Sequence, residues 1–193
     1  MRIIAGKQQG RRLETLDGEH TRPPLEKIRA AVFNSLQDML EGAHCLDLFA
    51  GSGSMGLEAL SRGAASCDFV ESGRECIRLL EGNLRALGVQ GGRVLRDKVP
   101  AVAAVLLREA RRYDFIFIDP PFDSYLKGFY HDLPLVFGAM LEDDGVLVMR
   151  IPENAPQASG GGGLCQIRER CHGISVLQFF QKKGARAPWE LEQ

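Results

Sequence analysis

The sequence of 193 residues has no apolar run long enough to cross a membrane, and its amino end lacks the hydrophobic segment of a secretory signal. We therefore expect a cytoplasmic protein with no membrane partner. Its five cysteines include no C-x-x-C pair, and its four histidines have no metal-ligand spacing with them. These absences predict reduced thiols and no metal site, as in a reducing compartment.

An excess of charge of one sign is also missing, because the formal net charge is -1. The whole protein is therefore no polycation, and any affinity for nucleic acid must come from a local patch. Aromatic residues make up 7% of the chain, hydrophobic residues 45% and charged residues 25%, which is an ordinary globular composition. The length predicts one domain with room for a small extension.

The most informative stretch is Cys45–Gly56, an apolar strand that runs into a glycine-rich turn. Gly51, Gly53 and Gly56 form a G-x-G-x-x-G pattern, which lets the backbone turn tightly and lets a ligand approach main-chain N–H groups. Helix formers follow from Met55 to Ser61, so the amino end of that helix would point at a ligand on the turn. A turn that serves only strand–helix packing gives the same pattern.

Strands and helices alternate after this turn. Further strands are expected at 66–71, 94–96, 113–118 and 145–149, with helices over 76–87, 99–106 and 133–141. A flexible loop at a hairpin is expected at 158–163, including Gly160–Gly163, and strands at 164–168 and 174–180 have no helix between them. We therefore predict a Rossmann-like α/β fold: a mostly parallel seven-stranded sheet, helices on both faces and a closing antiparallel hairpin.

The amino-terminal residues carry a local positive charge. Residues 1–12 contain four cations and no anionic side chain, namely Arg2, Lys7, Arg11 and Arg12. Glycine-flanked cations on a loop suit contacts with phosphates, although a charged edge strand, here 2–6, gives the same pattern. A helix is expected after Pro23-Pro24, and Arg22 and Arg29 are either surface charges or part of the basic face.

Carboxylates stand at the ends of the expected strands, where open parallel sheets bind their ligands. Glu71 follows Gly51 by 20 residues, where a carboxylate can accept hydrogen bonds from ribose hydroxyls or cap the next helix. Asp97 can likewise accept from an adenine amino group or cap a helix. Up to this point, the ligand is either a nicotinamide dinucleotide or a mononucleoside.

The sequence Asp119-Pro120-Pro121-Phe122, after the strand at 113–118, separates these two alternatives. Two consecutive prolines make a stiff turn without N–H donors, so their carbonyl groups become fixed acceptors. Asp119 and the Pro120 carbonyl can accept the two hydrogens of an exocyclic amine, and Phe122 can stack on the base. A hydride-transfer enzyme has no evident use for this set.

These motifs resemble those of class I S-adenosylmethionine-dependent methyltransferases. Four segments are, more specifically, similar to the RsmD family of bacterial enzymes, which methylate a guanine N2 in 16S ribosomal RNA: Arg2-Ile-Ile-Ala-Gly-Lys, Arg22-Pro, Phe33-Asn-Ser-Leu and Asp47-Leu-Phe-Ala-Gly-Ser-Gly. The resemblance covers residues 1 to about 150 well and the final hairpin loosely. Pro23-Pro24-Leu25-Glu26 and the run Gly160–Gly163 depart from the family pattern.

The resemblance implies a role for each matching residue. S-adenosylmethionine would contact Asp47, Phe49, Gly51, Ser52, Gly53, Glu71, Ser72, Asp97 and Lys98. Asp119, Pro120 and Phe122 would be catalytic, and RNA would contact Lys7, Arg11, Arg12 and Arg22. The expected substrate is 16S rRNA in a 30S particle, bound by a monomer.

The corresponding domain division is an RNA-binding extension at 1–40, a methyltransferase domain at 41–185 and a polar tail at 186–193. The rival functions are an adenine-N6 methyltransferase, a nicotinamide-binding oxidoreductase and a non-catalytic ribosome-assembly factor with a nucleoside pocket.

Overall fold

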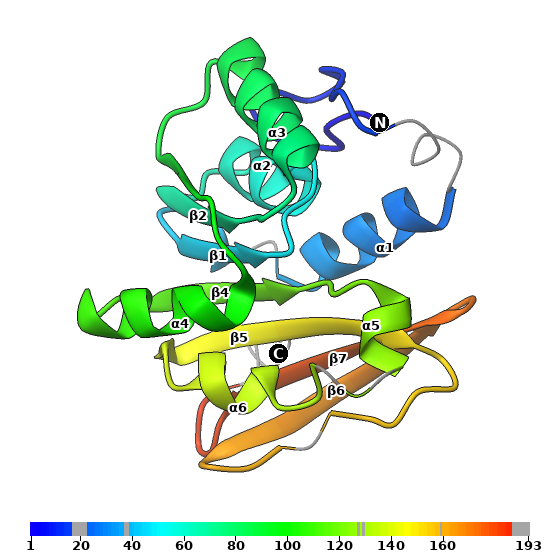
Figure 1. Cartoon of the computed structure of the whole chain (residues 1–193), viewed down its shortest axis with the longest axis vertical. Coiled ribbons are helices and arrows are strands. Elements are labelled where there is room, and N and C mark those ends of the chain that lie inside the picture. Colours follow the sequence, from blue (N-terminus) through cyan, green and yellow to red (C-terminus); the bar gives the residue numbers. More distant parts are fainter. Residues whose placement is uncertain (17–22, 37–38, 127, 129, 159, 187–193) are drawn as a thin grey trace.

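A computed structural model describes residues 1–16, 23–36, 39–126, 128, 130–158 and 160–186. Its centre is a seven-stranded sheet in the order β3-β2-β1-β4-β5-β7-β6 (Figure 1). Strands β1 to β5 run parallel, and β7 is antiparallel to both β5 and β6, so the predicted fold is confirmed. The strands are β1 (His44–Leu48), β2 (Ser66–Val70), β3 (Gly92–Leu95), β4 (Tyr113–Ile118), β5 (Leu141–Pro152), β6 (Leu164–His172) and β7 (Ser175–Lys182).

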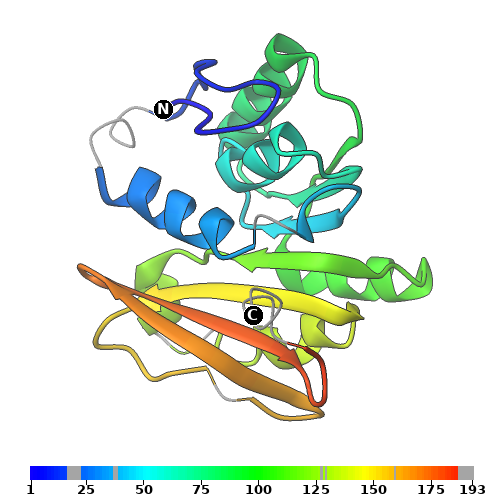
Figure 2. The same ribbon diagram turned by 180° about the vertical axis from the view of Figure 1, so that it is seen from behind.

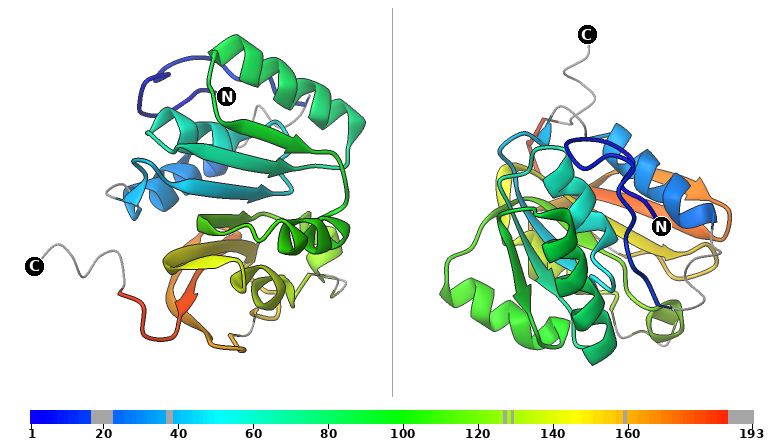
Figure 3. Two further views of the ribbon diagram at one scale, coloured as in Figure 1. Left: turned by 90° about the vertical axis from the view of Figure 1, so that its left-hand side faces the viewer. Right: turned by 90° about the horizontal axis from the view of Figure 1, so that it is seen from above.

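Helices cover both faces of the sheet, because its central strands are apolar on both sides. One buried cluster joins α1, α2 and α3 to the first face, and a second joins α4, α5 and α6 to the other. Helix α1 faces the viewer in Figure 2, and Figure 3 shows the layers from the side and from above. The helices are α1 (Pro23–Asn34), α2 (Ser54–Ser61), α3 (Arg74–Leu87), α4 (Val99–Arg108), α5 (Phe122–Leu126) and α6 (Leu133–Gly138).

Three expected elements differ most from the structure, and β6 also runs four residues beyond the predicted end at 168. The helix predicted over 133–141 ends at Gly138, because Leu141 already pairs with Tyr113 and begins a longer β5. The strand predicted at 2–6 is reduced to a single antiparallel bridge between Arg2 and Arg12.

The third difference concerns the loop predicted at 158–163, of which residue 159 lies outside the described residues. This loop connects β5 to β6, two strands that β7 separates in the sheet, so it is no hairpin turn. The hairpin turn lies instead between β6 and β7, where Gly173 has a φ of 60°, a left-handed conformation that glycine adopts without strain.

The amino-terminal residues 1–16 pack onto α2 and α3. Ile3 and Leu13 belong to the buried cluster of the first face, and the backbone amides of Ile4 and Ala5 donate to Glu58 at 2.8 and 3.0 Å. The side-chain amide of Asn83 on α3 bonds to the backbone of Glu14. The division at residue 40 remains a prediction, but this segment shares the core of the sheet domain.

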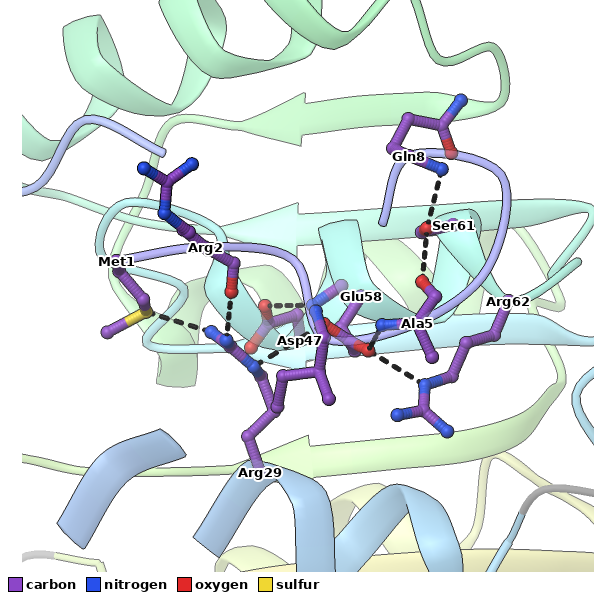
Figure 4. A network of polar contacts seen from close by, with 11 residues as sticks. Met1, Arg2, Ala5, Gln8, Arg29, Asp47, Glu58, Ser61 and Arg62 are labelled. Carbon is purple, nitrogen blue, oxygen red and sulfur yellow. Dashed lines mark hydrogen bonds and ion pairs between the residues drawn. The ribbon is translucent and has the colours of Figure 1, made fainter. Parts of the chain in front are cut away.

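A buried ion cluster secures the same segment to α1 and α2 (Figure 4). The Glu58 carboxylate is 0% exposed; it accepts from Arg62 Nε at 2.8 Å and lies 3.5 Å from Arg29 Nε. Arg29 is 1% exposed and also donates to the Arg2 carbonyl, so it is neither a surface charge nor part of a basic face. Burial lowers the pKa of Arg29, and Glu58 opposes that change.

Within the described residues, no helix is both long and apolar enough to span a bilayer.

Candidate active site

The parallel strands end in register, which collects their last residues at one edge of the sheet. Leu48 pairs with both Val70 and Ile118, Val70 pairs with Leu95, and Ile118 pairs with Met149. The predicted convergence of strand ends is therefore confirmed. The residues that follow these aligned positions are Phe49, Glu71, Arg96, Asp119 and Arg150.

The glycine turn between β1 and α2 is held by its neighbours. Gly51 and Gly53 have φ values of 55° and 86°, which side chains rarely adopt. A Cβ at Gly53 would lie 2.3 Å from Leu80 Cδ1, whereas a Cβ at Gly51 would meet open space. The Gly51 amide donates to Glu71 at 2.8 Å, and Asn83 donates to the carbonyl of buried Ser52 at 3.0 Å.

Asp47 lies beneath this turn, where it is 2% exposed. Its carboxylate accepts from the Gly56 amide at 2.9 Å, so it ties β1 to the first turn of α2. Burial raises its pKa to about 7; the Gly56 amide lowers the pKa, and the carboxylates of Asp119 and Glu71 raise it. The side chain thus supports the turn from below, and its predicted contact with a cofactor remains a prediction.

A cavity of about 340 Å³ opens beside the turn. Its wall brings together five of the predicted cofactor residues with four others: Phe49, Val70, Glu71, Ser72, Asp97, Lys98, Val99, Pro100 and Tyr130. Phe49 has a φ of 63°, a strained conformation for an aromatic residue, and its ring packs edge-on against Tyr130 with 4.9 Å between centroids. Aromatic and apolar walls with a few polar groups suit a nucleoside.

The two carboxylates of this cavity have different surroundings. Glu71 accepts from the amides of Ser72 and Gly73, both at 2.7 Å, and from Gly51, so it orders the turn before α3, although α3 itself begins without a side-chain cap. Exposed Asp97 accepts only from the amide of Lys98 among the described residues, and α4 begins without a side-chain cap. Both carboxylates line the cavity, where contact with a ribose or a base remains a prediction.

The segment Asp119–Phe122, here called the acidic corner, follows β4, the strand next to β1. Asp119 Oδ1 accepts from Arg150 Nε at 2.7 Å, and the Arg150 guanidinium lies over the Phe122 ring, 4.7 Å from its centroid. Burial raises the pKa of the Asp119 carboxyl, and Arg150 partly offsets that rise. The Pro121 carbonyl accepts within α5, whereas no described donor bonds to the carbonyl of buried Pro120.

Asp119, Pro120 and Phe122 do not line the cavity itself. They lie beside it, because Asp119 follows the residue that pairs with Leu48, and Phe49 follows Leu48. The arrangement therefore offers a nucleoside-sized cavity with a carboxylate, a free carbonyl and an aromatic ring at its flank. Among the described residues, no three His, Cys, Asp or Glu side chains are grouped to hold a metal ion.

The predicted RNA-contacting cations lie on the docked amino-terminal segment. Lys7 and Arg12 are exposed, whereas exposed Arg11 also donates to the Ala86 carbonyl at the end of α3 at 2.7 Å. Arg22 lies outside the described residues.

Two residues of this edge were missing from the sequence prediction. Arg150 lies one residue beyond the predicted strand 145–149, so the strand-end argument that found Asp119 would also have found it. Tyr130 lies between β4 and α6 without a periodic pattern, and nothing in the sequence indicated its contact with Phe49.

Comparison with known proteins gives a family model, described as "Conserved hypothetical protein 95", that matches residues 1–181. The chain is 32% identical over 187 residues to "Putative rRNA methyltransferase YlbH" of Bacillus subtilis, covering 95% of this chain and 100% of that protein. It is 38% identical over 122 residues to "Ribosomal RNA small subunit methyltransferase D" of Escherichia coli, covering 63% of this chain and 60% of that one.

Solved structures agree with these sequence relatives. "Putative methyltransferase yhhF" from Escherichia coli superposes with a TM-score of 0.79 at 28% identity, covering 96% of this chain and 99% of that chain. "SMU.776, a putative methyltransferase complexed with SAH" has a TM-score of 0.67 at 15% identity, covering 81% and 49%, and shows a shared fold.

Proposed function

The chain belongs to the RsmD family, and from this premise we propose that it transfers a methyl group from S-adenosylmethionine to the N2 amine of a guanine in 16S ribosomal RNA during small-subunit maturation. The observation that carries the proposal is the placement of Asp119 and the glycine turn at the ends of adjacent strands β4 and β1. The acidic corner can hold an exocyclic nitrogen while the glycine turn holds a methyl donor.

The residues of the cavity fit the adenosyl part of this cofactor. Glu71 and Asp97 offer carboxylate oxygens to hydroxyl and amino hydrogens, and Phe49, Val99 and Tyr130 offer apolar surface to a base. The volume of about 340 Å³ lies within the usual range for small-molecule sites. When bound, S-adenosylmethionine supplies an electrophilic methyl group on a sulfonium.

The acidic corner acts on the amine. The lone pair of guanine N2 is delocalised into the ring, so hydrogen bonds from the amine to Asp119 and the Pro120 carbonyl favour a tetrahedral nitrogen and stabilise its developing positive charge. With the amine held by Asp119 and the Pro120 carbonyl, its nitrogen would bond to the methyl carbon of the donor, and the electron pair of the broken sulfur–carbon bond would go to sulfur. The product ammonium is acidic and loses its proton afterwards, so Asp119 need not be a strong base. Phe122 offers a ring on which an unpaired or flipped guanine can stack.

Cofactor identity can be tested by calorimetry. We expect S-adenosylhomocysteine to bind at one site per chain and NAD to give no heat of binding. Tight binding of NAD without binding of S-adenosylhomocysteine would replace this proposal by an oxidoreductase.

The exposed cations of the amino-terminal segment are proposed to hold the RNA backbone. Lys7→Glu with Arg12→Glu is expected to weaken binding of a 16S rRNA fragment and to reduce the slope of log affinity against log salt by about 1 per lost phosphate contact. Arg112→Glu is the matched control, because Arg112 is an exposed cation just before β4 and does not belong to the amino-terminal segment. Equal affinities and slopes for the three proteins would make the cluster a solvated surface; Arg11 is left unchanged because its guanidinium contacts α3.

A further inference from the structure

Arg150 of β5 touches two of the residues that the proposed reaction uses. Because Ile118 and Met149 pair in register, Asp119 and Arg150 extend side by side from neighbouring strands. Arg150 Nε donates to Asp119 Oδ1 at 2.7 Å, and its guanidinium carbon lies 4.7 Å from the centre of the Phe122 ring. A single side chain thus links the acidic and the aromatic parts of the corner.

The backbone around Arg150 makes this link rigid. Arg150 pairs with Leu177 of β7, so its main chain is fixed within the sheet, whereas Asp119 and Phe122 lie at and beyond the end of β4. A guanidinium is planar and can donate in its plane while its face stacks on an aromatic ring, a combination that an ammonium group does not reproduce. Arg150 is therefore suited to holding both groups in one geometry.

The contact leaves the reactive features of the corner available. Arg150 bonds to Oδ1 of Asp119, and no described donor bonds to Oδ2. The side chains of Asp119 and Arg150 are 32% and 18% exposed, so this edge is open to a ligand. A partly exposed ion pair contributes little to stability, so stabilising the fold does not by itself explain the contact between Arg150 and Asp119.

We propose that Arg150 is a positioning residue for methyl transfer: it fixes Asp119 so that Oδ2 accepts a hydrogen of the target amine, and it holds one face of Phe122 so that the other receives the base. This inference rests on the proposed function. A nucleophile that is displaced by about 1 Å can lose about 100-fold in rate, so a loosened acceptor should be visible in turnover.

The test is steady-state methylation of 30S subunits by Arg150→Met, Arg150→Ala and Arg150→Lys proteins. The methionine variant keeps an apolar stem in the half-buried position and guards against failure of the alanine variant to fold. For both neutral variants we expect kcat to fall about 10- to 100-fold, with the KM for S-adenosylmethionine changed less than two-fold and the melting temperature nearly unchanged. The lysine variant should recover part of kcat, because it restores the positive charge but not the planar guanidinium that stacks on Phe122.

Arg108→Ala, at the exposed end of α4, is the matched control and should leave kcat and KM unchanged. A kcat within two-fold of the wild type in the neutral variants would overturn the inference. A rise in turnover would also overturn it, because Arg150 would then obstruct the base. These failures differ from failure of the proposed function, in which the wild-type protein itself transfers no methyl group.

Discussion

Replacing Asp119 by alanine is expected to abolish methyl transfer while leaving the affinity for S-adenosylhomocysteine within a few-fold of the wild type. The carboxylate lies at the acidic corner but outside the wall of the cavity, so its loss removes the amine acceptor and spares the proposed cofactor contacts. Loss of one group that stabilises developing charge typically lowers kcat by about 100- to 1000-fold. The measurements are single-turnover methylation and calorimetry on the same preparation.

Two further variants sharpen this result. Asp119→Asn keeps one oxygen acceptor without the charge and is expected to retain more activity than alanine. Asp132→Ala removes an exposed carboxylate just before α6 and should behave as the wild type. If Asp119→Ala lost cofactor binding instead of turnover, Asp119 would belong to the cofactor site, and its assignment as the acceptor for the target amine would be wrong.

Replacing Glu58 by alanine is expected to lower the free energy of unfolding by about 3–5 kcal/mol, the usual effect of removing one member of a buried ion pair. The change leaves Arg29, which is 1% exposed, without its carboxylate, and it removes the acceptor for the amides of Ile4 and Ala5. Chemical denaturation at equilibrium measures the difference, and the melting temperature should fall by roughly 10 °C for a chain of this size.

Glu75→Ala supplies the matched control, because Glu75 is an exposed carboxylate in the first turn of α3 and its loss should change stability by less than about 0.5 kcal/mol. The double variant Glu58→Gln with Arg29→Met removes both charges and should recover part of the loss. Equal stabilities of Glu58→Ala and Glu75→Ala would show that the buried cluster does not secure the amino-terminal segment.

Most of the sheet could be predicted because its strands are short apolar runs bounded by glycines and charged residues. The sequence Tyr113–Ile118 forms β4 with the expected bounds, and the helix predicted over 76–87 ends at Leu87 as expected, where Gly88 follows in a left-handed conformation. The boundary at Leu141 was missed because an apolar residue can end a helix or begin a strand, and pairing with Tyr113 decides between them. Tertiary contacts of this kind are invisible in local periodicity.

In the candidate site, too, the motif residues could be predicted from the sequence, whereas their tertiary contacts could not. Motif residues at strand ends were found, because parallel strands bring their carboxyl ends to one edge. The burial of Arg29 could not be found, since its partners Glu58 and Arg2 lie on other elements and charged residues are usually exposed. Asp47 illustrates the same limit: the motif identified the residue, but the structure was needed to reveal its bond to Gly56 beneath the turn.

The most direct test of the central claim is mass spectrometry of nucleosides from 16S rRNA after 30S subunits that lack the modification are incubated with the protein and isotope-labelled S-adenosylmethionine. We expect label in N2-methylguanosine, in an amount that rises with the amount of enzyme, and no label with Asp119→Ala. Label only in N6-methyladenosine, or no label in any nucleoside while the wild-type protein is folded and binds the cofactor, would contradict it.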